Sequence, residues 1–205
     1  MLKLRNMVSR ASLTAAFVCL SLCAQVIEFE SNGLRYKTLT RGGVTVMFAA
    51  LPVHIRDYSI IQVAISNGSP ISWTVKPEDF TFQRSDGTVL QATPAVDVVN
   101  SFIHHSGRQD VIKLVSTYEA GLYGNTHMKS TNGYEARRQN ALAEVSSARL
   151  KAGAAASAIV LAPIKLAAGE STDGAVFFAG AGKTLGAGRL VAHVAGEMFE
   201  FEYAE

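Results

Sequence analysis

Short runs of alternating apolar and polar residues fill positions 36–92, and they restrict the fold of this chain more than any other feature. The stretch reads YKTLTRGGVTVMFAALPVHIRDYSIIQVAISNGSPISWTVKPEDFTFQRSDGTVLQA. Turn-forming clusters such as Gly-Gly and Ser-Asp-Gly separate the runs, which is typical of antiparallel strands. Residues two apart on a strand share a face, and the predicted faces carry Ile61, Val63 and Ile65, then Trp73 and Val75, then Phe80 and Phe82. Such faces bury most simply against a second sheet, so we expect the Trp73 ring to lie between two sheets.

The other end of the chain supplies that second sheet or completes it. Residues 158–178 contain two apolar runs around a Gly-Glu-Ser turn that begins at Gly169, and residues 188–205 contain two alternating strands around Ala195-Gly196-Glu197. His193 lies on the first of these strands. Because no second histidine has ligand spacing to it, we expect a half-exposed residue of a sheet face there and not a metal ligand.

The order of residues in these two regions resembles a known family. Tyr58 begins the pattern Y-x-x-x-Q-V-A-I-S-N-G-S-P-I-S-W-x-V-x-P-E-D-F-T-F-x-x-x-D-G, and Lys165 begins K-L-x-x-G-E-S-x-x-G-A-V-F-F. Both patterns resemble the bacterial extracytoplasmic immunoglobulin-like domains of unknown function, which are often found on secreted proteins and lipoproteins. The resemblance covers about residues 45–90 and 157–203. It implies an immunoglobulin-like antiparallel β-sandwich in an exported setting, and it carries over no catalytic residue.

Residues from about 93 to 156 depart from that pattern and predict two or three helices inserted between the halves of the sandwich. Thr93-Pro94 is a typical helix start, and a first helix should end near His105. Ser106–Gln109 resembles a capping box that opens a second helix, and Asn132–Glu135 can cap a third, whose helical spacing continues to about residue 156. The predicted apolar stripes contain Val96, Val99 and Ile103; Val111, Leu114, Val115, Tyr118 and Leu122; and Tyr134, Ala141, Val145, Ala148, Ala152 and Ala155.

The third helix is basic and rich in alanine, which raises the question of what its outer face does. Its apolar stripe should pack on the domain, while Arg137, Arg138, Arg149 and Lys151 should face outward. These four residues are the candidate partner-binding face, with an envelope protein as the partner, although most charged faces of this kind are only solvated. A membrane-surface helix is the weaker interpretation, because alanine offers little apolar area for interfacial binding.

The N-terminus predicts export. Three basic residues precede an uncharged stretch at positions 11–24 that is too short to remain as a membrane span. We therefore expect a signal peptide over residues 1–24 and a mature N-terminus between Ala24 and Val26. The remaining 25–205 should form one domain that is periplasmic or secreted, because a chain of that length can bury a core of its own.

Removal of the signal would take away both cysteines, Cys19 and Cys23, so the mature chain should form no disulfide and no thiolate metal site. Acylation of Cys23 is the alternative, but Leu22 stands where a lipoprotein signal has a small residue. The same cut removes three of the 19 basic residues and none of the 17 acidic residues, which leaves 16 against 17. A nearly neutral chain gives no reason to expect nucleic acid as a partner.

Two motifs suggest site chemistry but do not meet its requirements. Gly182-Lys183-Thr184 ends like a phosphate-binding loop, yet Phe177 occupies the position of the first glycine of that motif, so we expect a glycine-rich hairpin loop. His104 and His105 point about 100° apart on a helix, which suits a shared metal poorly, and His127 is the only further histidine near them in the sequence. We therefore assign no catalytic residue, no cofactor and no metal ligand.

These observations predict an exported, non-catalytic binding or assembly module of the bacterial cell envelope. The predicted fold is mainly β, an immunoglobulin-like sandwich with a helical insertion. The alternative is an envelope hydrolase whose site lies at the seam between the insertion and the sandwich, because ligand sites often form where structural units meet.

Overall fold

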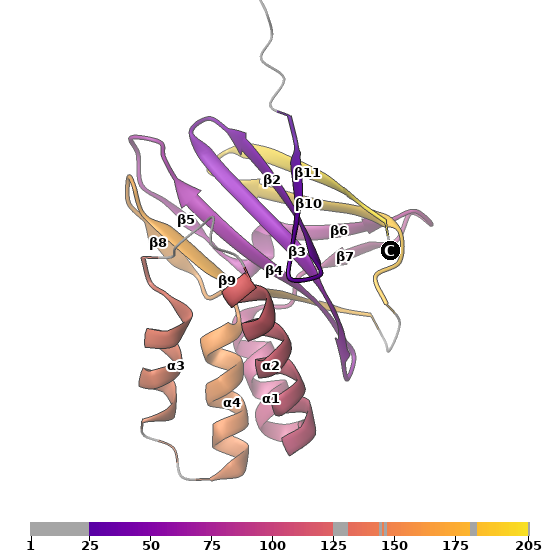
Figure 1. The fold of residues 1–205 in the computed structure, drawn as a ribbon, viewed down its shortest axis with the longest axis vertical. Coiled ribbons are helices and arrows are strands. Elements are labelled where there is room, and N and C mark those ends of the chain that lie inside the picture. Colours follow the sequence, from indigo (N-terminus) through magenta and orange to yellow (C-terminus); the bar gives the residue numbers. More distant parts are fainter. Residues whose placement is uncertain (1–24, 125–130, 144, 146, 181–183, 205) are drawn as a thin grey trace, which may run out of the picture.

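The computed structural model describes residues 25–124, 131–143, 145, 147–180 and 184–204. Within these residues the chain is mainly β, with two antiparallel sheets, a two-stranded ribbon and a block of helices (Figure 1). The predicted class, mainly β with an inserted helical block, is confirmed, since the α-helices of the described chain all lie between strands β7 and β8. The predicted signal peptide lies outside the described residues.

The strands before and after the helical block complete the same sheets. In the described chain the larger sheet has the order β1 (Ile27–Ser31), β2 (Leu34–Arg41), β3 (Val44–Ile55), β4 (Tyr58–Asn67) and β9 (Ser171–Ala179). The smaller sheet has the order β11 (Glu197–Tyr203), β10 (Gly188–Val194), β6 (Phe80–Arg84) and β7 (Val89–Gln91), and the ribbon pairs β5 (Trp73–Val75) with β8 (Ile164–Leu166). The pairs β4–β9, β6–β10 and β5–β8 each join the two halves of the chain.

Strands β4 and β9 of the larger sheet are buried on both faces. Ile61, Val63 and Ile65 pack toward the smaller sheet in one cluster with Phe80 and Phe82, as the alternation predicted. Side chains on the opposite face of the same sheet, such as Ile60 on β4 and Ala175 and Phe177 on β9, belong to a second cluster that includes residues of the helices. A strand covered on both sides favours apolar residues at consecutive positions, which explains why the second half of β9, from Ala175 to Phe178, does not alternate.

Two-residue turns set the register of the outer hairpins. Asn32 and Gly33, with φ of 51° and 74°, connect β1 to β2, and Ala195 and Gly196, with φ of 55° and 78°, connect β10 to β11. Left-handed backbone at both central residues gives the turn whose twist matches that of paired strands. The turn predicted at residues 195–197 is confirmed.

Asn67 organises the turn after β4 and ties it to the ribbon. Its side chain is fully buried; the amide donates to the carbonyls of Ile71 and Leu166, and the amide oxygen accepts from the backbone N–H and hydroxyl of Ser69. Each polar atom of this buried side chain is therefore satisfied, which offsets the cost of removing it from water. The Asn-Gly-Ser-Pro stretch thus forms a turn because its asparagine replaces missing backbone partners.

Trp73 is less enclosed than expected. It lies on β5, in the ribbon and not in either larger sheet, and its half-buried ring packs at the margin of the core between the sheets. The indole Nε1 is buried without a hydrogen-bond partner in the described chain. The ring was predicted to be buried between the two sheets; it packs against the core between them but is only half-buried, because Trp73 lies on the ribbon.

The described helical block has four helices, where two or three were predicted: α1 (Ala95–His105), α2 (Arg108–Gly124), α3 (Tyr134–Leu142) and α4 (Ala148–Ile159). They pack on the face of the larger sheet that points away from the smaller one, at the lower end of the view in Figure 1. Phe102, Leu114 and Tyr118 are fully buried there. The stripe of α2 is thereby confirmed at its centre, whereas Val96, predicted to be apolar contact surface on α1, is 68% exposed.

The helix predicted to run unbroken from residue 132 to about 156 is two helices. α3 ends at Leu142 and α4 begins at Ala148, where the Ser147 hydroxyl accepts a hydrogen bond from the Leu150 N–H at 3.2 Å. A serine N-cap inside a helical run starts a new helix, and here the chain reverses so that α3 and α4 pack side by side (Figure 1).

The structure differs from the predicted stripe of the third helix and from the predicted caps of the first two helices. Tyr134, Ala152 and Ala155 of the predicted stripe are buried, Ala141 and Val145 are half-buried, and the side chain of Ala148 lies outside the described part. α1 begins after Pro94, without a side-chain cap from Thr93. At the start of α2 the carboxylate of Asp110, and not the Ser106 hydroxyl, accepts from the Gly107 N–H at 3.0 Å.

Candidate ligand site between the two sheets

A bulge in β3 opens one end of the space between the sheets. The pairing of β3 with β4 is regular as far as Ala50 opposite Ile61, and it then resumes at His54 opposite Ser59. Three residues of β3 with Pro52 at their centre therefore stand against one residue of β4. Proline has no N–H to give to a strand ladder, and an extra-residue bulge bends a strand away from its neighbours. The bend lies where the chain forms its candidate site.

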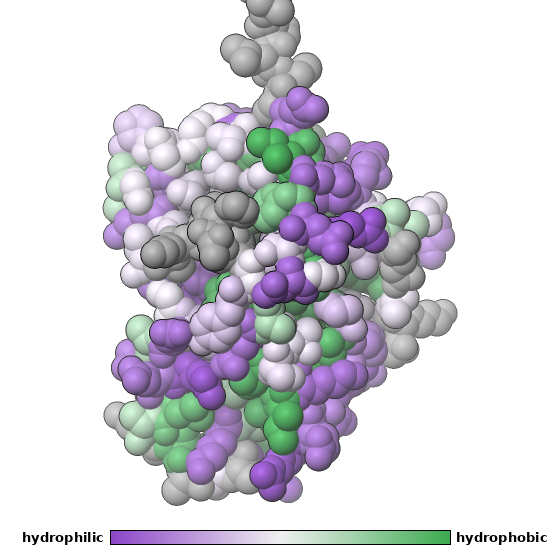
Figure 2. Space-filling model, in the orientation of Figure 1, coloured by the Kyte–Doolittle hydropathy of each residue, from purple (hydrophilic) through white to green (hydrophobic). Residues whose placement is uncertain are grey.

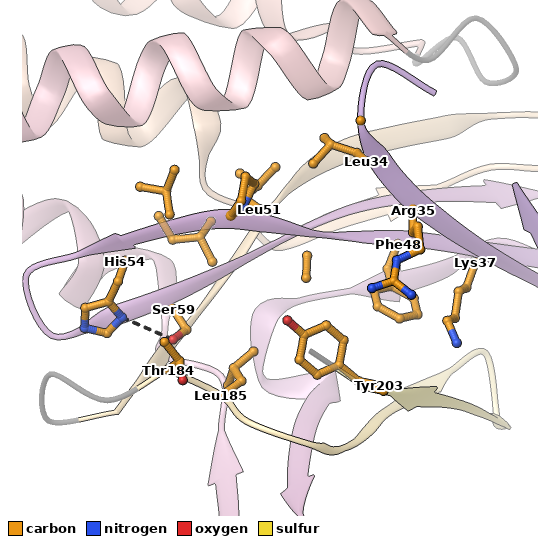
Figure 3. Close-up of a pocket in the computed structure, with 16 residues that line it drawn as sticks. Leu34, Arg35, Lys37, Phe48, Leu51, His54, Ser59, Thr184, Leu185 and Tyr203 are labelled. Carbon is orange, nitrogen blue, oxygen red and sulfur yellow. Dashed lines mark hydrogen bonds between the residues drawn. The ribbon is translucent and has the colours of Figure 1, made fainter. Parts of the chain in front are cut away.

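A cavity of about 510 Å³ lies beside the bulge (Figure 3). Its described wall comes from β2, β3, β4, the segment before β10 and the end of β11. Phe48 and Leu185 supply buried apolar surface, and Ala50 and Tyr203 are half-buried on the wall. This volume lies in the range of sites that hold small organic ligands, and the lining combines apolar side chains with polar ones.

Two cations line one end of the cavity. Arg35 and Lys37 project from the same face of β2, and Figure 3 shows them at the same end of the cavity as the Tyr203 ring. The Lys37 side chain is 18% exposed and its Nζ lies 2.7 Å from Oε1 of Glu28, which compensates part of its charge. The described wall contains no Asp or Glu. Glu28 and Glu30 on β1 are the cross-strand partners of Lys37 and Arg35, and only Lys37 is ion-paired to its partner among the described residues. The Arg35 guanidinium is therefore the cation at this end that can bind an anion.

His54 and Ser59 form a polar pair at the opposite end. They are partners across the β3–β4 ladder, and His54 Nδ1 lies 3.2 Å from the Ser59 hydroxyl (Figure 3). A serine nucleophile works with a base that a third group orients. Since no carboxylate is present among the described wall residues to orient the imidazole, the pair supplies a hydrogen-bonding edge to the wall.

A second set of polar side chains converges beneath the helices, at the seam where the sequence placed an alternative active site. The Tyr118 hydroxyl donates to Oδ2 of Asp173 at 2.7 Å, and Nη2 of Arg137 lies 3.0 Å from the same oxygen. Arg137 also donates to the carbonyl of Ala158 on α4 at 3.0 Å. Burial and the adjacent Asp173 carboxylate raise the pKa of Tyr118 well above its ordinary value. The seam therefore holds a buried ion pair that joins β9, α2, α3 and α4.

The four residues predicted to form an outward partner-binding face do not lie together. Arg137 is only 22% exposed and points inward to Asp173, so its predicted outward orientation is wrong. Arg138 is 44% exposed and its guanidinium lies 2.9 Å from the Glu119 carboxylate on α2. Arg149 and Lys151 are exposed in the first turn of α4, at the end of the block farthest from the sheets (Figure 1). The break between α3 and α4 separates the two pairs.

The outer surface of the helical block is mostly hydrophilic on the face that Figure 2 shows, with small separate hydrophobic areas. Val96, Ile112 and Leu150 are exposed, but they belong to three different helices. Isolated apolar side chains are ordinary on protein surfaces. Within the described part of the chain, no helix combines the length and the apolar character that a membrane crossing requires.

The remaining candidate residues do not converge. His104 and His105 are exposed with ring centroids 6.2 Å apart, and His193 is exposed on β10. His127 and the predicted hairpin loop at Gly182-Lys183 lie outside the described residues. Among the residues that are described, no three His, Cys, Asp or Glu side chains are placed to hold a metal ion.

The cavity between the sheets was not anticipated from the sequence, although one signal for it was present. Pro52 stands inside an otherwise regular strand pattern, and proline in such a run indicates a bulge or an edge. Comparison with known proteins adds no relative: no protein-family model, no curated protein and no solved structure matches this chain.

Proposed function

We propose that this chain is an exported, non-catalytic binding module that holds a small ligand in the cavity between its sheets. The observation that carries the proposal is the cavity of about 510 Å³, whose described wall combines buried apolar side chains with two cations and no carboxylate. The signal pattern at residues 1–24 supports an extracytoplasmic location. Kinship with the extracytoplasmic immunoglobulin-like domains is part of the same proposal, and two antiparallel sheets packed face to face support it.

The state of the seam favours this module over the envelope hydrolase. Apolar side chains of the sheet and of the helices pack against one another there, and Tyr118, Arg137 and Asp173 are bonded to each other. Hydrolysis requires titratable groups that a substrate and water can reach. The cavity at the bulge offers access and volume, whereas the seam offers paired and buried groups.

We expect protein purified from its natural envelope to carry a bound small molecule that the variant Ala50→Phe lacks. Ala50 is half-buried on the cavity wall, so a phenyl ring at this position takes up ligand volume. Native mass spectrometry of a tagged chromosomal copy measures the bound mass. Arg108→Gln is the matched control, because Arg108 is exposed on α2 and is not part of the described wall. Equal bound masses in wild-type and Ala50→Phe protein, or none in the wild type, would contradict the proposal.

The same preparation tests export. We expect its N-terminus to lie between Ala24 and Val26, because the short uncharged stretch before it has the pattern of a cleaved signal. Mass spectrometry of the intact protein gives this end directly. An intact Met1, or an acyl group on Cys23, would show that the export part of the proposal is wrong.

A further inference from the structure

We infer that the ligand is an organic anion with an apolar body, a carboxylate or a phosphate monoester on an alkyl chain, whose head lies at Arg35 and Lys37. This inference rests on the proposed function, because it names the class of molecule that the cavity would hold. It also gives the ligand an orientation: the anionic head lies at Arg35 and Lys37, and the alkyl chain extends toward His54 and Ser59.

The charge at the cavity mouth carries the first step. Arg35 is exposed on β2, and within the described chain no ion pair joins its guanidinium to a carboxylate. A guanidinium presents its N–H groups as a fork that matches carboxylate and phosphate oxygens. Lys37 adds a second cation, partly compensated by Glu28. A cationic ligand would meet these charges, and the nearest carboxylates, Glu28 and Glu30 on β1, are not part of the described wall.

The interior of the cavity carries the second step. Phe48 and Leu185 are at most 4% exposed, line the cavity and belong to the same apolar cluster between the sheets. Figure 3 shows Leu185 between Arg35 at one end and His54 at the other, with Phe48 at the Arg35 end. An alkyl chain running from the cations toward the His54–Ser59 edge would contact these side chains. Each methylene removed from water raises the affinity roughly fourfold, so affinity should grow with chain length.

Calorimetric titration of the mature protein tests the inference with octanoate, decanoate, decyl phosphate, 1-decanol and decyltrimethylammonium. We expect decanoate and decyl phosphate to bind at least about tenfold more tightly than decanol, because a charge-assisted hydrogen bond raises affinity by about that factor or more. Decanoate should bind roughly 15-fold more tightly than octanoate, two methylenes shorter. Added salt should weaken the anions and not decanol.

Three variants locate the head group. Arg35→Gln should weaken decanoate roughly tenfold and leave decanol unchanged, whereas Arg35→Lys, which keeps the charge, should recover part of the loss. Arg108→Gln, a charge change of the same kind outside the described cavity wall, should change neither affinity. Circular dichroism confirms that each variant is folded before titration.

The possible outcomes distinguish failure of the anion assignment from failure of the proposed binding function. Decanol or decyltrimethylammonium binding as tightly as decanoate, or decanoate unaffected by Arg35→Gln, would overturn the anion assignment and leave the cavity as the binding site. The anion assignment is also overturned, and the cavity remains the binding site, if no alkyl compound binds while the wild-type protein from the natural envelope carries a bound mass that Ala50→Phe lacks. Equal decanoate affinity in wild-type and Ala50→Phe protein would overturn the cavity itself, and the proposed function with it.

Discussion

Replacing Arg137 by alanine should lower the free energy of unfolding by roughly 3 kcal/mol, the lower end of the range for breaking a buried ion pair from one side. The Asp173 side chain is 6% exposed, so loss of the guanidinium leaves a buried carboxylate whose remaining side-chain donor among the described residues is Tyr118. The variant also loses the bonds from Arg137 to the carbonyls of Ala158 and Asp173, which tie α3 to α4 and β9. Urea unfolding followed by circular dichroism measures the difference.

Arg138 provides the matched control, one residue further along the same helix. Its side chain is 44% exposed, and its guanidinium pairs with Glu119, whose side chain is 23% exposed. Water screens such a pair, and exposed ion pairs contribute at most about 1 kcal/mol. Arg138→Ala should therefore cost no more than about 1 kcal/mol. Equal losses from the two variants would show that Arg137 is not part of a buried pair.

A double variant distinguishes the lost pair from lost packing. In Arg137→Met with Asp173→Asn, both charges are removed, the arginine stem is replaced by a chain of similar shape, and the Asn side-chain oxygen can still accept from Tyr118. Removal of both partners of a buried pair is often neutral, so we expect this protein to be more stable than Arg137→Ala. A further loss in the double variant would mean that the arginine acts mainly through its bonds to backbone carbonyls.

The fold could be predicted where the local pattern and the tertiary environment agree. The alternation around Ile61–Ile65 and the apolar stripe at Leu114 and Tyr118 identified buried faces, because one face of each element meets solvent or a neighbour of a different kind. The helix break could not be predicted from periodicity. Alanine-rich residues before and after Ser147 continue the helical spacing, and only the serine cap indicates that the chain reverses.

The same limits apply to the site. An exposed arginine and a buried, paired arginine have the same sequence pattern, and only the position of α3 over Asp173 on β9 separates Arg137 from Arg138. The cavity depends on the bulge at Pro52 and on the approach of β11 to β2, which are 140 or more residues apart in the chain. The secondary-structure propensities of neighbouring residues do not indicate that β11 and β2 lie close together. Residue types such as Arg35 and Leu185 become one site only through the tertiary fold.

High pH should unfold this protein through the tyrosines under its helices. Tyr36, Tyr118 and Tyr134 are at most 2% exposed. Burial raises the pKa of Tyr36; burial and the Asp173 carboxylate raise that of Tyr118, and burial and a hydrogen bond to Glu119 raise that of Tyr134. Each phenol therefore stays neutral in the folded protein at a pH where the unfolded chain has begun to ionise near its ordinary value of 10.0.

The sign follows from the protons bound in each state. Below about pH 10 both states carry the phenolic protons, and these groups do not change stability with pH. Above it the unfolded state loses protons that the folded state keeps, so stability falls as pH rises toward the folded pKa values. Each tyrosine contributes a slope of about 1.4 kcal/mol per pH unit, and three together about 4 kcal/mol per pH unit.

Urea unfolding between about pH 8 and pH 11, with tyrosinate absorbance recorded in parallel, measures this slope. Tyr36→Phe isolates one contribution: it removes a 2.6 Å hydrogen bond to the Gly121 carbonyl, which costs about 1 kcal/mol at every pH. Above about pH 10 the variant should lose stability more slowly than the wild type, by about 1.4 kcal/mol per pH unit, because one ionisable phenol is gone from the unfolded chain. The two curves should therefore converge and cross. Parallel curves across the whole range would mean that Tyr36 ionises as readily in the folded protein as in the unfolded chain, and that the helical block does not shield it from water.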